Sequence, residues 1–268
     1  MRSVRIPAPP LPAVPRLGRL LAGLLALLGA LSPAVAPGQT RAGAGAPAAG
    51  THTVRMHLYA PEGQTLLYEG LRTIERRDGQ VVVSTTYTRP GGEVVQRTEA
   101  VYEADTLASV SYRLEDRRSG EQELLDRDGE WLRMSYRAKA ADAPATGSAQ
   151  PAPDLRFTAT VEPTILREWA RLMAGEDVPF RLLVPSRQDT YRFRLRREEA
   201  PALQQPGRLI VRMEPGTWLV RQLVDAMFFA LEQAPPHRLL EFRGRSSLKM
   251  DDGADQDVRI VYEYPAQG

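Results

Sequence analysis

The chain contains no cysteine, two lysines and three histidines among its 268 residues. The absence of cysteine excludes disulfides, thiolate metal sites, cysteine nucleophiles and a lipid-modified N-terminal cysteine. Basic and acidic residues are nearly balanced, at 35 and 33. Proteins that bind DNA or RNA usually concentrate an excess of positive charge, so we expect no nucleic-acid partner.

Motifs for common chemistries are also lacking. The sequence has no Gly-x-Ser-x-Gly elbow and no glycine-rich phosphate loop. His52 and His57 are five residues apart, which is poor spacing for a zinc site. We therefore expect no metal, no cofactor and no enzymatic activity. One alternative is a hydrolase in which His237 acts with a nearby serine such as Ser246 or Ser247.

The N-terminal region is typical of a secretory signal. Four arginines precede an uncharged apolar run, Leu20–Leu31, and small residues follow it. The run is too short to span a membrane comfortably, since a spanning helix needs about 20 apolar residues. We predict a signal peptide over 1–36, cleaved after Ala34 or Ala36, and a periplasmic protein with no stable membrane span. Removing the four arginines changes the net charge from +2 to −2.

Two segments rich in glycine, alanine and proline interrupt the rest of the chain. Residues 37–50 are predicted to be a flexible linker. Residues 138–153 have a similar composition and are predicted to be a disordered insertion. The remainder forms a single β-rich domain over 51–265, which is long enough to bury a substantial core.

Alternating polar and apolar residues predict antiparallel strands in both halves of this domain. Val81–Thr88 and Val94–Glu103 are strand-like and flank a turn that contains Pro90, Gly91 and Gly92. In the second half, Tyr191–Arg196 alternates strictly between apolar side chains and arginines. Short strands at this spacing predict a meander with one buried face.

One helix is predicted between the two halves. Pro163 suits a first helical turn, and Gly175 suits the C-terminal end. The apolar side chains between them recur at helical spacing, at Ile165, Leu166, Trp169, Leu172 and Met173. The segment 217–233 is ambiguous: we favour a short helix over 217–225 and then a strand, and the alternative is one arm of a hairpin with Arg238–Arg243.

These elements predict an α+β, mainly β, fold: a curved antiparallel sheet, or unclosed β-barrel, with one or two helices on its concave face. Several aromatic side chains are expected to face that concavity. They either pack solidly against the helix or bind a hydrophobic ligand, and the candidates are Trp169, Phe180, Phe193, Trp218 and Phe228.

The alternating arginines give a second candidate site. Arg192, Arg194 and Arg196 project from one face of the same strand. Guanidinium groups suit phosphates and carboxylates, so these side chains are candidate contacts for an anionic headgroup. The alternative is an ordinary solvated face of the sheet.

The order of the second-half segments is similar to a known fold. The helix, Val178–Arg187, Arg238–Ser246 and Val258–Tyr262 together resemble secreted bacterial proteins of unknown role that are related to the LolA/LolB-like lipoprotein-carrier fold. The resemblance implies a half-open β-barrel whose concave face, covered by helices, takes acyl chains. It assigns no functional residue, because none of the carriers' residues has a matching position here.

The expected function is that of a periplasmic, non-enzymatic protein that binds a hydrophobic or acylated ligand, or an envelope protein, in envelope maintenance. The alternative is a structural or protein-interaction module with a solid core, acting through an edge strand or the concave surface.

Overall fold

The computed structural model describes residues 50–200, 203–217 and 224–265. All of them belong to one compact unit, Pro47–Gly268. The predicted signal peptide and nearly all of the predicted linker lie outside the described residues, as does Trp218. Within the described residues, every helix is too short or too polar to cross a membrane.

The described residues form one sheet of 15 strands, with two short helices and two 3₁₀ turns. The strands before the helices are β1 (Gly50–Tyr59), β2 (Leu66–Arg77), β3 (Gln80–Thr88), β4 (Val94–Glu103), β5 (Ser109–Asp116), β6 (Gln122–Asp128), β7 (Trp131–Arg137), β8 (Ala145–Ala149) and β9 (Leu155–Arg156). The helical segments are η2 (Thr158–Thr160), α1 (Val161–Arg167) and α2 (Trp169–Met173). The later elements are β10 (Val178–Val184), η3 (Pro185–Arg187), β11 (Asp189–Arg197), β12 (Arg208–Pro215), β13 (Met227–Glu232), β14 (Leu239–Lys249) and β15 (Asp255–Glu263).

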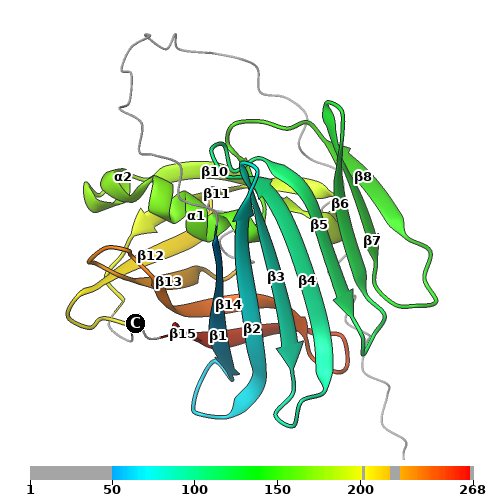
Figure 1. Ribbon diagram of the computed structural model, residues 1–268, viewed down its shortest axis with the longest axis horizontal. Helices are drawn as coiled ribbons and strands as arrows, with labels where there is room; N and C mark the ends of the chain where they lie inside the picture. Colours follow the sequence, from blue (N-terminus) through cyan, green and yellow to red (C-terminus); the bar gives the residue numbers. More distant parts are fainter. Residues whose placement is uncertain (1–49, 201–202, 218–223, 266–268) are drawn as a thin grey trace, which may run out of the picture. The chain divides into compact units, whose positions relative to one another are not determined.

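The first described strand, β1, lies in the middle of the sheet. β1 pairs with β15, and the chain then builds outward strand by strand to β8 at one edge. It crosses through β9 and the helices to β10, and returns strand by strand to β15 (Figure 1). β8 and β9 end the strand order and do not pair with each other, so the sheet is the unclosed barrel that the sequence predicts. Every strand pair is antiparallel except β9 with β10.

The inner face of the sheet is filled by a row of apolar side chains from five neighbouring strands. Their registers place them side by side in the order Leu58, Ile260, Phe242, Phe229 and Val211. Ile165 and Leu172, from the two helices, are fully buried in the same cluster. The helices therefore lie on the concave face, as predicted, because one stripe of each must be removed from water.

β10 is buried on both faces. Leu182 belongs to the main core cluster, whereas Leu183 belongs to a second cluster that also contains Leu155 and Phe157. This second cluster includes buried residues from β3 to β7. A strand covered on both sides has a continuous apolar run rather than strict alternation, which explains Leu182-Leu183-Val184.

The predicted disordered insertion over 138–153 is wrong. Residues Ala145–Ala149 form β8, which pairs along its length with β7. Gly147 shows why small residues stand there: a Cβ atom at this position would lie 2.6 Å from the Gln188 Cβ and 2.9 Å from its carbonyl oxygen. The composition was typical of a linker, but here it allows close packing of the edge strand.

The second part of the ambiguous segment 217–233 is a strand, as predicted. Met227–Glu232 is β13, and it forms a hairpin with β14. The helix predicted over 217–225 falls mostly on residues 218–223, outside the described residues.

Packing of the helix against the sheet is tested by two adjacent residues. Ile165 is 0% exposed and Leu166 is 38% exposed. We expect Ile165→Ala to lower the free energy of unfolding by about 3 kcal/mol, because it leaves a cavity in the core. Leu166→Ala should change it by about 0.5 kcal/mol or less. Urea unfolding of both variants checks this, and equal effects would contradict the placement of α1.

Candidate functional site

A cleft of about 450 Å³ opens beside helix α1. We call it the α1 cleft. It lies between the start of β1, the helix and the turn that joins β13 to β14, and residues after β15 complete it. The side chains that line it are His52, Thr53, Arg76, Glu162, Leu166, Pro236, His237, Arg238, Tyr264 and Pro265. Its volume lies in the range of small-molecule sites.

An ion pair joins the helix to the sheet at this cleft. Arg72 Nη1 of β2 lies 2.7 Å from Glu162 Oε2 of α1, and both side chains are mostly buried. Burial alone would lower the pKa of Arg72, but the Glu162 carboxylate raises it above its usual range. Removing either partner would leave a charge in poorly solvated surroundings. The pair therefore fixes α1 and neutralises Glu162.

The turn between β13 and β14 forms the opposite wall. The His237 ring stacks on the Trp169 ring, with centroids 3.8 Å apart and an interplanar angle of 21°. His237 Nδ1 lies 3.2 Å from the Glu232 carbonyl oxygen. Trp169 packs against the main core, so it supports this wall from behind. The stacked pair thus docks the turn onto α2.

The cleft has an excess of positive charge. Neither Arg76 nor Arg238 forms an ion pair with any described residue, and Arg76 is half-buried. The Arg238 guanidinium lies 5.3 Å from the centroid of the Tyr264 ring. Burial, followed by the charges of Arg76 and Arg72, lowers the pKa of His52. The arrangement favours an anionic group and disfavours a cation.

The predicted aromatic residues do not come together around a ligand space. Phe180 and Phe193 are buried in the main core, with ring centroids 6.1 Å apart. Phe228 lies on the opposite face of β13 from Phe229 and belongs to a small separate cluster. The expectation that Phe228 faces the concavity is therefore wrong, because adjacent residues of a strand point to opposite faces.

The three predicted anion contacts share one face of β11, but two of them already have carboxylate partners. Arg194 binds Glu214 and also Asp177. Arg196 lies 3.6 Å from Glu198. Arg192 is exposed and forms no ion pair with a described residue. Among the three, Arg192 has the charge most available to a ligand.

The serine partners considered for His237 are not beside it. Ser246 and Ser247 lie toward the far end of β14. The Ser247 hydroxyl donates to Gln96 Oε1 at 2.8 Å, and the Ser246 hydroxyl donates to the Leu248 carbonyl at 2.9 Å. The predicted pairing of His237 with either serine is therefore wrong.

The sequence did not reveal the α1 cleft, because its residues come from separate segments and form no motif. Arg76, Tyr264 and Arg238 were not singled out. The sequence signal that could have identified Arg76 is the alternation along β2, which places Arg72 and Arg76 on the same face. Within the described part of the chain, no group of three or more histidine and acidic side chains could hold a metal ion.

No protein-family model matches this chain, and no curated protein matches its sequence. By fold, the chain is similar to a crystal structure of a beta-barrel-like protein of a domain of unknown function, DUF1849, from Brucella abortus. The TM-score is 0.45 and the identity 8%, over 80% of this chain and 95% of that chain. So distant a likeness carries no argument about function.

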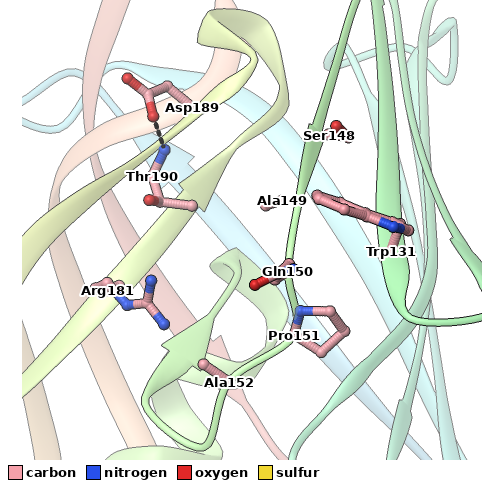
Figure 2. Close-up of a pocket in the computed structure, with 9 residues that line it drawn as sticks. All are labelled: Trp131, Ser148, Ala149, Gln150, Pro151, Ala152, Arg181, Asp189 and Thr190. Carbon is pink, nitrogen blue, oxygen red and sulfur yellow. Dashed lines mark hydrogen bonds between the residues drawn. The ribbon is translucent and has the colours of Figure 1, made fainter.

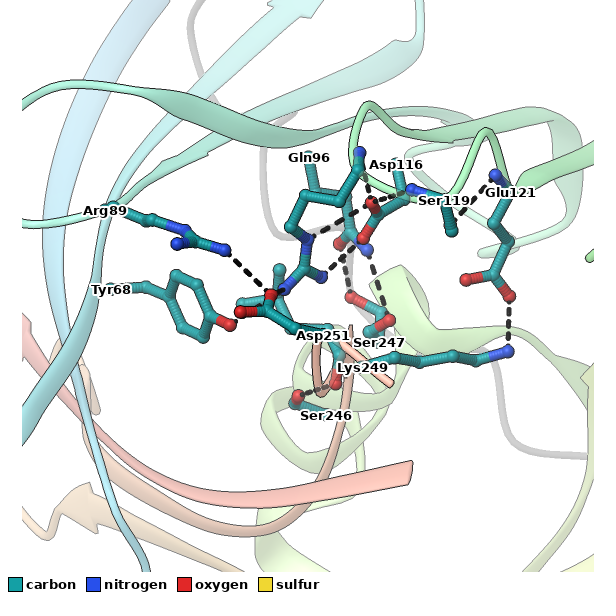
Figure 3. Close-up of polar contacts among 12 residues, drawn as sticks. Tyr68, Arg89, Gln96, Asp116, Ser119, Glu121, Ser246, Ser247, Lys249 and Asp251 are labelled. Carbon is teal, nitrogen blue, oxygen red and sulfur yellow. Dashed lines mark hydrogen bonds and ion pairs between the residues drawn. The ribbon is translucent and has the colours of Figure 1, made fainter. Parts of the chain in front are cut away.

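A polar cluster joins the β14–β15 turn to β2 and to the end of β5 (Figure 3). Arg118 binds Asp116 through Nη2 and Oδ2 at 2.5 Å, and it also donates to Tyr68 and Asp251. Its groups satisfy one another. We assign this cluster a structural role.

In the same region, Glu121 forms an ion pair with Lys249, and the charges of both act on Glu123. Lys249 Nζ lies 2.7 Å from Glu121 Oε1, and Glu121 is 3% exposed. Burial raises the pKa of Glu123 to about 7, and the charge of Glu121 adds to this effect. A hydrogen bond with Ser186 and the charge of Lys249 oppose it. Glu123 is therefore partly protonated at neutral pH.

The raised pKa of Glu123 predicts that the stability of the protein depends on pH. Its pKa rises from 4.5 in the unfolded chain to about 7 in the folded protein. Between these values the folded protein keeps a proton that the unfolded chain has lost, so this contribution to stability falls as pH rises. We expect Glu123→Gln to flatten the decline between pH 5 and pH 8, and to stabilise the protein at pH 8 by on the order of 2 kcal/mol. Urea unfolding at several pH values measures this, and a parallel decline in the variant would contradict it.

Proposed function

We propose that this protein is a periplasmic, non-enzymatic binding protein that holds a small hydrophobic molecule with one anionic group in the α1 cleft. Its role would belong to envelope maintenance. The observation that carries the proposal is the pair of guanidinium groups, Arg76 and Arg238, that line the cleft without an ion-pair partner among the described residues.

The apolar part of the ligand has its own contacts. Leu166 is an exposed large hydrophobic residue on α1, and its side chain lines the cleft. Pro236, Tyr264 and Pro265 add apolar surface. A carboxylate between two guanidinium groups, with a hydrocarbon tail on these side chains, would satisfy both kinds of surface.

The filled core determines where such a ligand can bind. The inner row of the sheet packs directly against the helices, so the concavity itself is occupied by side chains. A relation to the lipoprotein-carrier fold is part of this proposal, with the ligand at the edge of the helix rather than beneath it. An acyl chain is the ligand class that this relation favours.

Binding of a fluorescent fatty acid tests the proposal. The probe is 11-(dansylamino)undecanoic acid, titrated into the purified mature protein. We expect Arg76→Gln to weaken binding about tenfold, because it removes one charge-assisted hydrogen bond to the carboxylate. Arg77→Gln is the matched control, since Arg77 is exposed on the next position of β2 and should leave the affinity unchanged.

Two results would contradict the proposal. Failure of the wild-type protein to enhance dansyl fluorescence would exclude an acyl ligand. Equal affinities of Arg76→Gln and wild type would exclude the α1 cleft as its site.

The periplasmic location has a separate test. Export should release a mature chain that begins after Ala34 or Ala36. The intact mass of the protein from a periplasmic fraction measures this. A full-length chain in the cytoplasmic fraction would contradict the location.

A further inference from the structure

A second groove lies between β8 and the strands β10 and β11, and it shares no lining residue with the α1 cleft. Its volume is about 530 Å³. Figure 2 shows β8 and the segment after it on one side, with Arg181 of β10 and Thr190 of β11 opposite. We call it the edge groove.

One wall of the edge groove is an unpaired strand edge. β8 pairs with β7 and ends the strand order, so its other edge has no partner strand among the described residues. Ser148 and Ala149 of this strand line the groove. Such an edge offers peptide N–H and C=O groups, which an added extended segment can pair with.

Arg181 on the opposite wall belongs to an arginine pair that lacks a shared carboxylate, and the other member, Arg192, lies next to it, outside the lining of the groove. Arg181 and Arg192 lie directly opposite each other on β10 and β11. Like charges in this position repel. Asp154 accepts three hydrogen bonds from Arg181, at 2.9 to 3.2 Å, but makes no ion pair with Arg192.

Two other arginine pairs on this sheet show how such repulsion is relieved. Arg196 and Arg212 are opposite each other, and Glu198 lies within 3.6 Å of both guanidinium groups. Arg243 and Arg259 are also opposite. There the Arg243 guanidinium binds Glu241 at 2.8 Å, and the Arg259 guanidinium lies 4.5 Å from the Tyr59 ring centroid. In each case both members have a stabilising partner.

Arg192 is the exception among these six arginines. It is exposed, it has no ion pair with a described residue, and its opposite neighbour already holds a carboxylate. The nearest acid along the strand, Asp189, accepts a hydrogen bond from the Thr190 backbone N–H at 2.7 Å. The pair would therefore gain from an external anion.

We propose that the edge groove binds an extended acidic peptide segment of a partner protein, which pairs with the edge of β8 and places a carboxylate on Arg192. An apolar side chain of the same segment would pack on Trp131, which lines the groove and is 41% exposed. The backbone edge favours a peptide over a lipid headgroup, because only a peptide pairs with it. This inference is independent of the ligand proposed for the α1 cleft.

Fluorescence anisotropy of two peptides tests the inference. The probes are fluorescein-labelled Thr-Val-Glu-Val-Thr with an amidated C-terminus and its glutamine twin, measured against the mature protein. We expect the glutamate peptide to bind about tenfold more tightly than the glutamine peptide. Arg192→Gln should abolish that difference. Arg197→Gln, which removes an exposed charge from the same strand, should retain it.

Further arms separate the possible sources of an anion. Inorganic phosphate and free glutamate at millimolar concentration should displace little peptide, and Arg76→Gln should leave peptide binding unchanged. Any one of three results overturns the inference. These are no binding of either peptide, equal binding of the two peptides, or displacement of the glutamate peptide by phosphate with an affinity equal to that of the peptide itself. The last result would indicate a simple anion site without a peptide groove.

Discussion

The fold depends on one ladder of backbone hydrogen bonds, between β1 and β15. The strands β1–β8 and β10–β15 form two meanders. Within each meander every strand pairs with its neighbour in sequence, so each builds from short-range contacts. Only the central ladder pairs the first described strand with the last described strand. Because the meanders grow outward from it, the chain must cross from β8 to β10 between them. That crossing contains α1 and α2, so the topology that completes the sheet also delivers the helices to its concave face.

The alternation of side chains along each strand decides which arginines can meet a carboxylate. Along β2, Arg72 and Arg76 project on the same face, yet Glu162 of α1 meets only Arg72. Along β11, Arg194 and Arg196 meet acids, whereas Arg192 does not. A guanidinium group that gains a carboxylate contributes to the fold, and one that lacks it remains available to a ligand. Each of the two proposals places an anion on an arginine that lacks the carboxylate partner that its neighbours on the strand have.

The sequence predicted what depends on local periodicity. The alternation in Tyr191–Arg196 identified β11, and the stripe from Ile165 to Met173 identified the helices. It did not predict β8, because Ala145–Ala149 has weak strand propensity and is ordered by pairing with β7. It also misplaced Phe228, because the register of β13 was unknown. The α1 cleft assembles residues from β1, β2, α1 and two later segments, and no local pattern records such an assembly.

The central ladder also determines where the described domain begins and ends. Arg55 is opposite Glu263, so Gly50 and the end of β15 emerge at the same side of the sheet. Five residues of extended chain separate them along β1, a span of about 17 Å. A linker of six to eight residues is therefore long enough to join the two ends covalently. The chain could then be opened at a surface turn such as Asp78–Gly79. The circularly permuted protein would retain every strand pair of the sheet, but β2 and β3 would no longer be joined by a turn.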